Sequence, residues 1–171
     1  NGIIPLLLSV IWLYTSMELF FYSFLASISA VNSDTWATEI GSLSKKQPVN
    51  SINFIKIIKG ESGGITLIGT IGGIFGSIVT SILSTNNAYL LILISISGFL
   101  SCYCDSVLGS TLQAKYICKN CGKTNEIGFH CNQNSELIFG VLFFTNIFVN
   151  LLCSAFGAIV LIFFLFFLPL Y

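Results

Sequence analysis

The sequence predicts an all-α, polytopic transmembrane helix bundle, and three observations lead to that prediction. Of the 171 residues, 54% are hydrophobic and only 8% are charged, whereas a soluble domain carries about 25% charged residues. The apolar residues gather into long runs, which must be helical in lipid because the bilayer offers no partner to open backbone groups. The length allows one membrane domain over residues 1–171. Because the net charge is zero, no basic surface is available to hold a nucleic-acid backbone, so nucleic acid is not expected as a partner.

Five apolar segments are expected to form the helices. They are residues 3–14, 19–43, 64–83, 88–112 and 137–168, with a polar turn after the third and a hydrophilic Cys/His loop at 113–136. The first segment is too short to cross a bilayer alone, and the chain begins without Met. We therefore expect a fragment that lacks upstream membrane helices.

The basic residues predict how the bundle is oriented. All seven are Lys, and they fall only in the loop between the second and third segments and in the Cys/His loop. Alternating helices place both loops on one side, which the positive-inside rule makes the cytoplasm or its organellar equivalent, such as that of an endoplasmic-reticulum or plastid-type membrane. Any single Lys could serve this orientation alone and have no role in a binding site. These residues are Lys45, Lys46, Lys56, Lys59, Lys115, Lys119 and Lys123.

Acidic residues stand at the Lys-side ends of two apolar segments. Asp34 and Glu39 end the second segment, and Asp105 lies near the end of the fourth. A carboxylate at membrane depth costs about 2.5–3.5 kcal/mol of insertion free energy, so each needs a partner. Spacings of three and four residues place small or polar residues on shared helix faces, which predicts that these faces meet around a cleft. The faces are Ser23, Ser27, Ala30, Asp34 and Thr38; Ser97, Ser101, Asp105 and Gly109; and Asn146, Asn150, Ser154 and Gly157.

The glycines have two interpretations. Gly69/Gly73 and Gly72/Gly76 are two overlapping pairs of the GxxxG type, and tight helix packing is the favoured interpretation for them. The run Glu61-Ser62-Gly63-Gly64 is expected to open the third helix, where backbone N–H groups and the helix dipole favour an anion.

Together these residues indicate phosphoryl transfer. Asp34 and Asp105 on facing helices suit Mg²⁺, which is commonly bound through one or two carboxylates together with substrate phosphates. Glycine N–H groups and nearby Lys side chains supply the complementary anion site. The alternative class is an ion or proton relay, as in a transporter that uses intramembrane carboxylates.

The loop between the fourth and fifth segments predicts a second metal site. Cys118, Cys121, His130 and Cys131 are four soft ligands within 14 residues, and the CxxC pair is a frequent element of structural Zn²⁺ sites. Adjacent His130 and Cys131 make closure around one ion sterically less usual. The alternative is a set of free thiols, since disulfides are not expected if the Lys side is cytosolic. The other three cysteines are expected to be packing residues within helices.

The order of these motifs resembles one known family. The matching runs are Asn1-Gly2, residues 34–41 (Asp-Thr-Trp-Ala-Thr-Glu-Ile-Gly), Leu43-Ser44-Lys45, residues 62–67, residues 105–113, the Cys118–Cys121 knuckle, His130-Cys131, and the Asn146 and Asn150 pair. They resemble the transmembrane protein 19 family of integral membrane proteins, which includes the plant phytyl-phosphate kinase. The first acidic motif is also similar to one in dolichol kinases and CDP-lipid synthases, which use CTP.

The resemblance implies a membrane kinase that transfers a phosphoryl group from an NTP, with CTP the first choice, to a polyprenyl-type monophosphate whose tail lies among lipid. In this interpretation Asp34 and Asp105 hold Mg²⁺, and Glu39 is a third ligand or orients the others. Ser62, Gly63 and Gly64 cradle phosphates, and Lys45 and Lys59 supply positive charge. Gln113, Asn146 and Asn150 bind substrate or nucleotide. The alternatives remain a transporter or relay and a membrane protein without catalytic activity.

Overall fold

The computed structural model describes residues 2–167, and within them five α-helices are joined by loops that carry short β-strands. The helices are α1 (Ile3–Thr15), α2 (Glu18–Ser42), α3 (Leu67–Ser84), α4 (Ala88–Thr111) and α5 (Asn146–Phe167). The strands are β1 (Val49–Asn50), β2 (Gly64–Ile65), β3 (Lys115–Ile117), β4 (Thr124–Asn125), β5 (Phe129–His130), β6 (Gln133–Asn134) and β7 (Glu136–Phe139). The all-α bundle predicted from the sequence is therefore confirmed.

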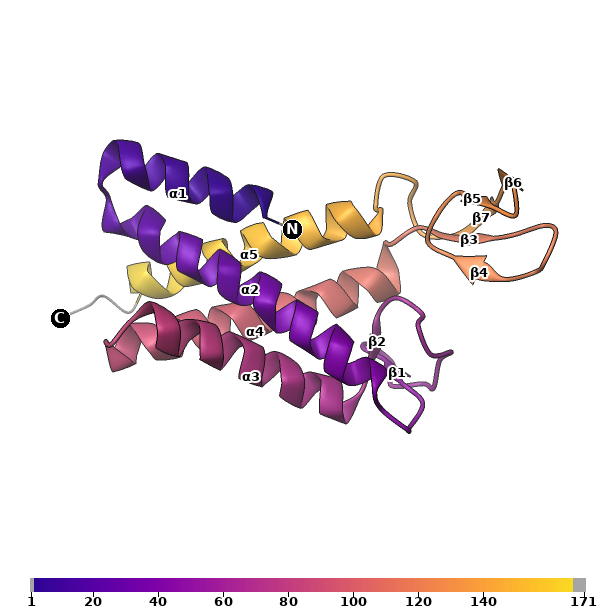
Figure 1. The fold of residues 1–171 in the computed structure, drawn as a ribbon, viewed down its shortest axis with the longest axis horizontal. Helices are drawn as coiled ribbons and strands as arrows, with labels where there is room; N and C mark the ends of the chain where they lie inside the picture. The colour runs from indigo at the N-terminus through magenta and orange to yellow at the C-terminus, as the bar shows by residue number, and fades with distance from the viewer. Residues whose placement is uncertain (1, 168–171) are drawn as a thin grey trace.

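Helix α2 is the centre of the bundle and packs against each of the other four helices. Figure 1 shows it crossing the molecule diagonally, with α1 on one side and α3 on the other. Within residues 2–167, three helices are long and apolar enough to cross a membrane by length and composition, namely α3, α4 and α5. Helix α2 has the length, but its buried Ser residues make it more polar. Its neighbours surround this polar helix, which lowers the cost of placing it at membrane depth.

The α2–α3 pair shows how the glycines act. A Cβ at Gly69 would lie 2.7 Å from the Ala37 carbonyl oxygen, and one at Gly76 would lie 2.9 Å from that of Asn32. The close approach lets polar side chains of α2 bond to the exposed backbone of α3: Ser33 donates to Gly73 O at 2.8 Å. Asn32 likewise donates to Gly76 O at 2.9 Å. The prediction that these glycines serve tight packing is confirmed, and interhelical hydrogen bonds add to it.

Two predicted helix boundaries were wrong, and strand pairing is the reason in both cases. Gly64 and Ile65 form β2, which pairs antiparallel with β1, so α3 begins only at Leu67. The Thr66 hydroxyl caps α3 by accepting from the Gly69 N–H at 3.1 Å. Residues 137–139 belong to β7, which pairs with β3, and α5 begins at Asn146. The predicted end of that helix at Leu168 lies outside the described residues.

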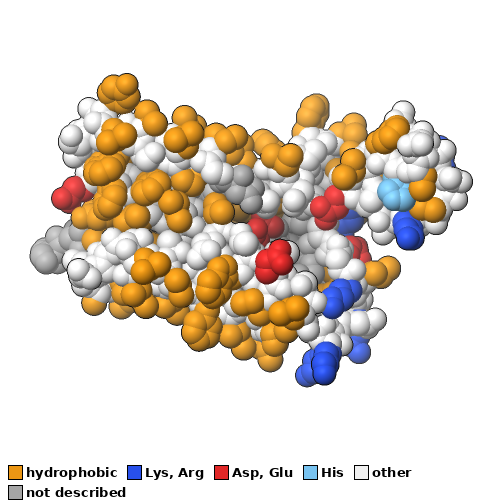
Figure 2. Space-filling model, in the orientation of Figure 1, with side chains coloured by type: hydrophobic (Ala, Val, Ile, Leu, Met, Phe, Trp, Pro, Cys, Tyr) orange, Lys and Arg blue, Asp and Glu red, His pale blue; other side chains and the backbone are white. Residues whose placement is uncertain are grey.

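The polar features gather at one end of the bundle. The α2–α3 loop and the long α4–α5 loop emerge there, whereas the short α1–α2 and α3–α4 turns lie at the opposite end (Figure 1). Figure 2 shows the basic side chains at that end and hydrophobic side chains along the helical part. The loops predicted to share one side of the membrane therefore do lie together. We call this region the loop end.

Candidate functional site

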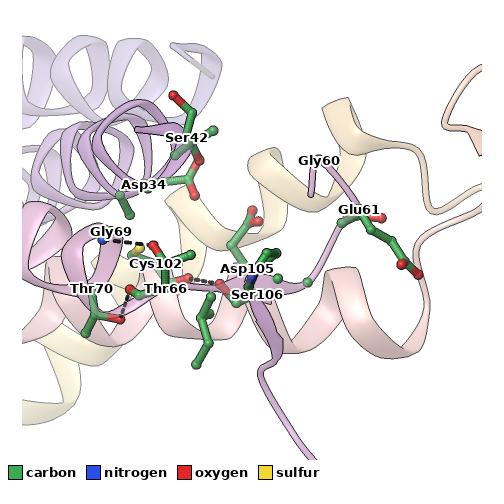
Figure 3. Close-up of a pocket in the computed structure, with 18 of the residues that line it drawn as sticks. Asp34, Ser42, Gly60, Glu61, Thr66, Gly69, Thr70, Cys102, Asp105 and Ser106 are labelled. Carbon is green, nitrogen blue, oxygen red and sulfur yellow. Dashed lines mark hydrogen bonds between the residues drawn. The ribbon is translucent and has the colours of Figure 1, made fainter. Parts of the chain in front are cut away.

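A cavity of about 560 Å³ opens at the loop end, between α2, α3, α4 and the α2–α3 loop. Asp34 of α2 and Asp105 of α4 both line it, and Figure 3 shows their side chains extending into the same space. The structure thus brings together the two acids that the sequence placed on facing helices. Six further predicted site residues line the cavity: Lys59, Ser62, Gly63, Gly64, Gln113 and Asn146.

Three predicted site residues lie elsewhere. Glu39 is exposed and does not line the cavity, because five residues of helix turn it away from Asp34. Lys45 is also exposed and outside the lining, where its neighbour Lys46 takes part instead. Asn150 lines a separate void of about 10 Å³ between α2, α4 and α5, which Asp34 and Asp105 also border.

Sequence reasoning missed several lining residues. Thr66 and Thr70 flank the start of α3, and they were overlooked because that start was misplaced. Glu126 reaches the cavity from the α4–α5 loop, and no pattern in the sequence signals this. Thr38 was placed on the cleft-facing side of its helix, four residues after Asp34, and it does line the cavity, although it was not named as a site residue.

Three atoms in the cavity wall are buried without a hydrogen-bond partner among the described residues. They are Asp105 Oδ2, Ser62 Oγ and Gln113 Nε2, and the whole Gln113 residue is only 2% exposed. A buried polar atom without a partner costs about 1–3 kcal/mol, so a ligand that supplied the missing bonds would be stabilised here. A carboxylate oxygen, a hydroxyl and an amide N–H together fit a hard cation with its phosphate ligand.

The α2–α3 loop lies against α4 because residue 63 is glycine. Gly63 has a φ of +81°, and a Cβ there would overlap both the backbone and the side chain of Ser110. Ser110 Oγ donates to Gly63 O at 3.0 Å, and the Ser51 N–H donates to the same oxygen at 3.1 Å. The prediction that Gly63 and Gly64 form the N-terminal turn of α3 was therefore wrong. They instead hold a loop beside the helix that carries Asp105.

Hydrogen bonds and one ion pair hold two lysines of the loop end in place. Lys115 donates to Glu61 Oε1 at 2.9 Å and to Ser62 O at 3.3 Å, and the side chain of Lys115 is only 14% exposed. Figure 3 shows the Glu61 side chain extending away from the two aspartates. Lys59 Nζ donates to Ser44 O at 3.2 Å. Lys46 and Lys59, which line the cavity, have no ion pair among the described residues, and Lys115 already pairs with Glu61.

The four predicted soft ligands meet in the α4–α5 loop. One ligand atom from each of Cys118, Cys121, His130 and Cys131 lies within 4.8 Å of the others. Hydrogen bonding from the Cys121 backbone, and then from the His130 ring, lowers the pKa of the Cys118 thiol to about 6. A hydrogen bond with the Cys121 thiol, followed by desolvation, raises the pKa of the Cys131 thiol to about 11. The remaining cysteines lie in helices, as predicted: Cys102, Cys104 and Cys153.

Comparison with known proteins gives the chain its family. A family model described as an integral membrane protein family, DUF92, matches residues 1–158. The chain is 28% identical over 123 residues to the uncharacterized membrane protein MJ0933 of Methanocaldococcus jannaschii. The aligned part is 70% of this chain and 51% of that protein. It is also 30% identical over 102 residues to Protein PGR of Arabidopsis thaliana. That aligned part is 51% of this chain and 35% of Protein PGR.

The chain thus spans about half, or less, of the length of the curated relatives it matches. No solved structure matches it. The motifs, the helix bundle and the match over residues 1–158 agree that this chain belongs to the DUF92 family of integral membrane proteins.

Proposed function

We propose that this protein is a membrane phosphotransferase that moves a phosphoryl group from an NTP to an isoprenoid-type monophosphate. The observation that carries the proposal is that one cavity is lined by Asp34 and Asp105 from facing helices, by the glycine-bearing loop and by two lysines. CTP as donor and a phytyl-type or polyprenyl acceptor are the choices implied by the motif resemblance. The acceptor's tail would extend among the exposed apolar side chains of the helices, since the cavity opens at the end of the bundle.

The residues present fit a divalent cation. Asp34 and Asp105 would hold Mg²⁺, which when bound neutralises charge on the phosphate oxygens. Lys46 and Lys59 would attract and orient the phosphates at the rim, and Ser62 would donate its hydroxyl to them. Gln113 would donate its unpaired amide N–H to phosphate or base, and Asn146, which also lines the cavity, would bind the same ligands. Fixed donors and charges of this kind lower the barrier of phosphoryl transfer mainly by positioning and electrostatics.

The competing class is an ion or proton relay. A relay needs titratable groups spaced along a path through the bundle, whereas Asp34 and Asp105 line one cavity at the loop end. This arrangement supports phosphoryl transfer. A phosphotransferase and a relay also predict different results in an assay of labelled nucleotide and of ion flux.

The test uses the full-length protein in detergent or vesicles, with γ-labelled NTPs and a panel of isoprenoid monophosphates. We expect label in the isoprenoid diphosphate, dependent on Mg²⁺ and largest with CTP. Metal removal by a chelator should abolish the product, and added Mg²⁺ should restore it. Ion or proton flux across sealed vesicles without nucleotide consumption would instead support the relay.

A substitution at Glu39 tests which acids take part. We expect Glu39→Gln to keep phosphotransfer within about threefold of wild type, because this exposed side chain lies outside the cavity. The measurement is kcat/KM for both substrates. A loss as large as that of a cavity aspartate would show that Glu39 does serve the site.

A further inference from the structure

The long α4–α5 loop folds without a hydrophobic core of its own. Between residues 115 and 139 only Cys118 is buried, and large apolar side chains such as Ile127, Phe129 and Ile138 are more than half exposed. A segment this small needs a cross-link when burial cannot stabilise it, and the usual cross-links are disulfides and metal ions. All the cysteines here are free.

The first two candidate ligands, Cys118 and Cys121, lie in one tight turn, which we call the knuckle. The Gly122 N–H donates to Cys118 O at 2.8 Å, and the Cys118 N–H donates to Lys123 O at 3.0 Å. Gly122 has a φ of +68°, which closes the turn. Cys118 and Cys121 thereby lie on one side of the same turn, as a CxxC metal knuckle requires.

The other two candidate ligands, His130 and Cys131, lie in the β5–β6 hairpin, whose turn explains how two adjacent residues can serve one site. Neighbouring side chains on a strand normally point to opposite faces. Here Cys131 and Asn132 form the hairpin turn with φ values of +51° and +59°. This left-handed backbone turns the Cys131 thiol back toward the His130 ring, with 3.2 Å between Sγ and Nδ1. A two-residue hairpin turn of this type needs positive φ at both central residues, so the tight β5–β6 connection sets this conformation.

The distances match a tetrahedral ion. A Zn–S bond of about 2.3 Å places neighbouring ligands of a tetrahedron about 3.5–3.8 Å apart. Cys121 Sγ and His130 Nδ1 lie 3.5 Å apart, and all four ligand atoms are within 4.8 Å of one another. Small side-chain rotations would therefore complete the site. Three sulfur ligands and one imidazole favour Zn²⁺ over Mg²⁺ or Ca²⁺, which prefer oxygen.

We propose that Cys118, Cys121, His130 and Cys131 bind one structural Zn²⁺ that joins the knuckle to the hairpin and so fixes one wall of the cavity. Strand β3 links the two sites: Lys115 at its start bonds to Glu61 and Ser62, and Gln113 lies just before it. Glu126, between the knuckle and the hairpin, lines the cavity as well. Four protein ligands close the coordination sphere, so the ion is structural, and the proposal does not depend on phosphoryl transfer.

The test measures metal in the purified full-length protein by mass spectrometry, after expression with zinc and purification without chelator. We expect about one zinc per chain in the wild type and less than a tenth of that in Cys118→Ser and in Cys131→Ser. Two controls should keep full zinc: Asn120→Ser, which changes the knuckle but no ligand, and Cys104→Ser, which removes a helix cysteine. Wild type without zinc, or controls that lose it equally, would overturn the proposal.

A second measurement does not depend on whether the variants fold. Removing metal from the wild type with a chelator should expose three more thiols to a thiol reagent, and added Zn²⁺ should protect them again. Co²⁺ in place of Zn²⁺ should give the absorption of a tetrahedral thiolate site. Thiol reactivity unchanged by the chelator, or a disulfide within the loop, would contradict the site.

Discussion

Asp105→Asn is expected to lower phosphotransfer by at least about 100-fold, which corresponds to about 2.7 kcal/mol of transition-state stabilisation. The substitution keeps the size of the side chain but removes the negative charge from the atom that lies buried and unpaired in the cavity wall. An amide is a weak ligand for Mg²⁺, so the apparent Mg²⁺ requirement should rise together with the loss of kcat. The measurement is transfer of label from CTP to the isoprenoid monophosphate over a Mg²⁺ titration.

Asp34→Asn should give a comparable loss, because both carboxylates line the same cavity. The double variant should lose little more than either single one if the two act as a unit. Glu18→Gln is the matched control, since Glu18 begins the same helix at the end opposite the cavity and should leave transfer unchanged. Full activity in both aspartate variants would contradict the proposed function.

Gly69→Leu is expected to give the largest loss of stability. Even a Cβ at this position would lie 2.7 Å from the Ala37 carbonyl oxygen and 3.0 Å from Gly41 Cα, so a branched side chain must push α2 away from α3. Overpacking a close contact costs about 1–3 kcal/mol, and lost interhelical hydrogen bonds add to it. The measurement is the midpoint of thermal unfolding in detergent, which we expect to fall by several degrees.

The same variant should also weaken phosphotransfer, because α2 carries Asp34 into the cavity. Ile71→Phe is the control: it adds volume to the same helix, but the side chain of Ile71 is 45% exposed. We expect its unfolding midpoint to match wild type. Equal stability of Gly69→Leu would show that α2 and α3 do not pack as closely as the structure has them.

Sequence patterns located most helices because apolar length and polar periodicity are local properties. The predicted segments 3–14, 19–43 and 88–112 agree with α1, α2 and α4 within one residue at each end. The errors at the third and fifth segments share a cause. Ile65 and residues 137–139 are as apolar as helix residues, but they pair with distant strands, and hydropathy does not register such pairing.

The membrane class, the cost of placing Asp34 and Asp105 in helices, and the four candidate ligands of the Cys/His loop could all be predicted before the fold was known. These follow from composition, spacing and residue chemistry alone. Tertiary structure was needed to learn that Lys46 and not Lys45 reaches the cavity, and that a left-handed turn at Cys131 brings two adjacent residues into one Cys/His cluster. Side-chain direction depends on backbone dihedrals and on packing with distant helices, and neither can be read from local sequence.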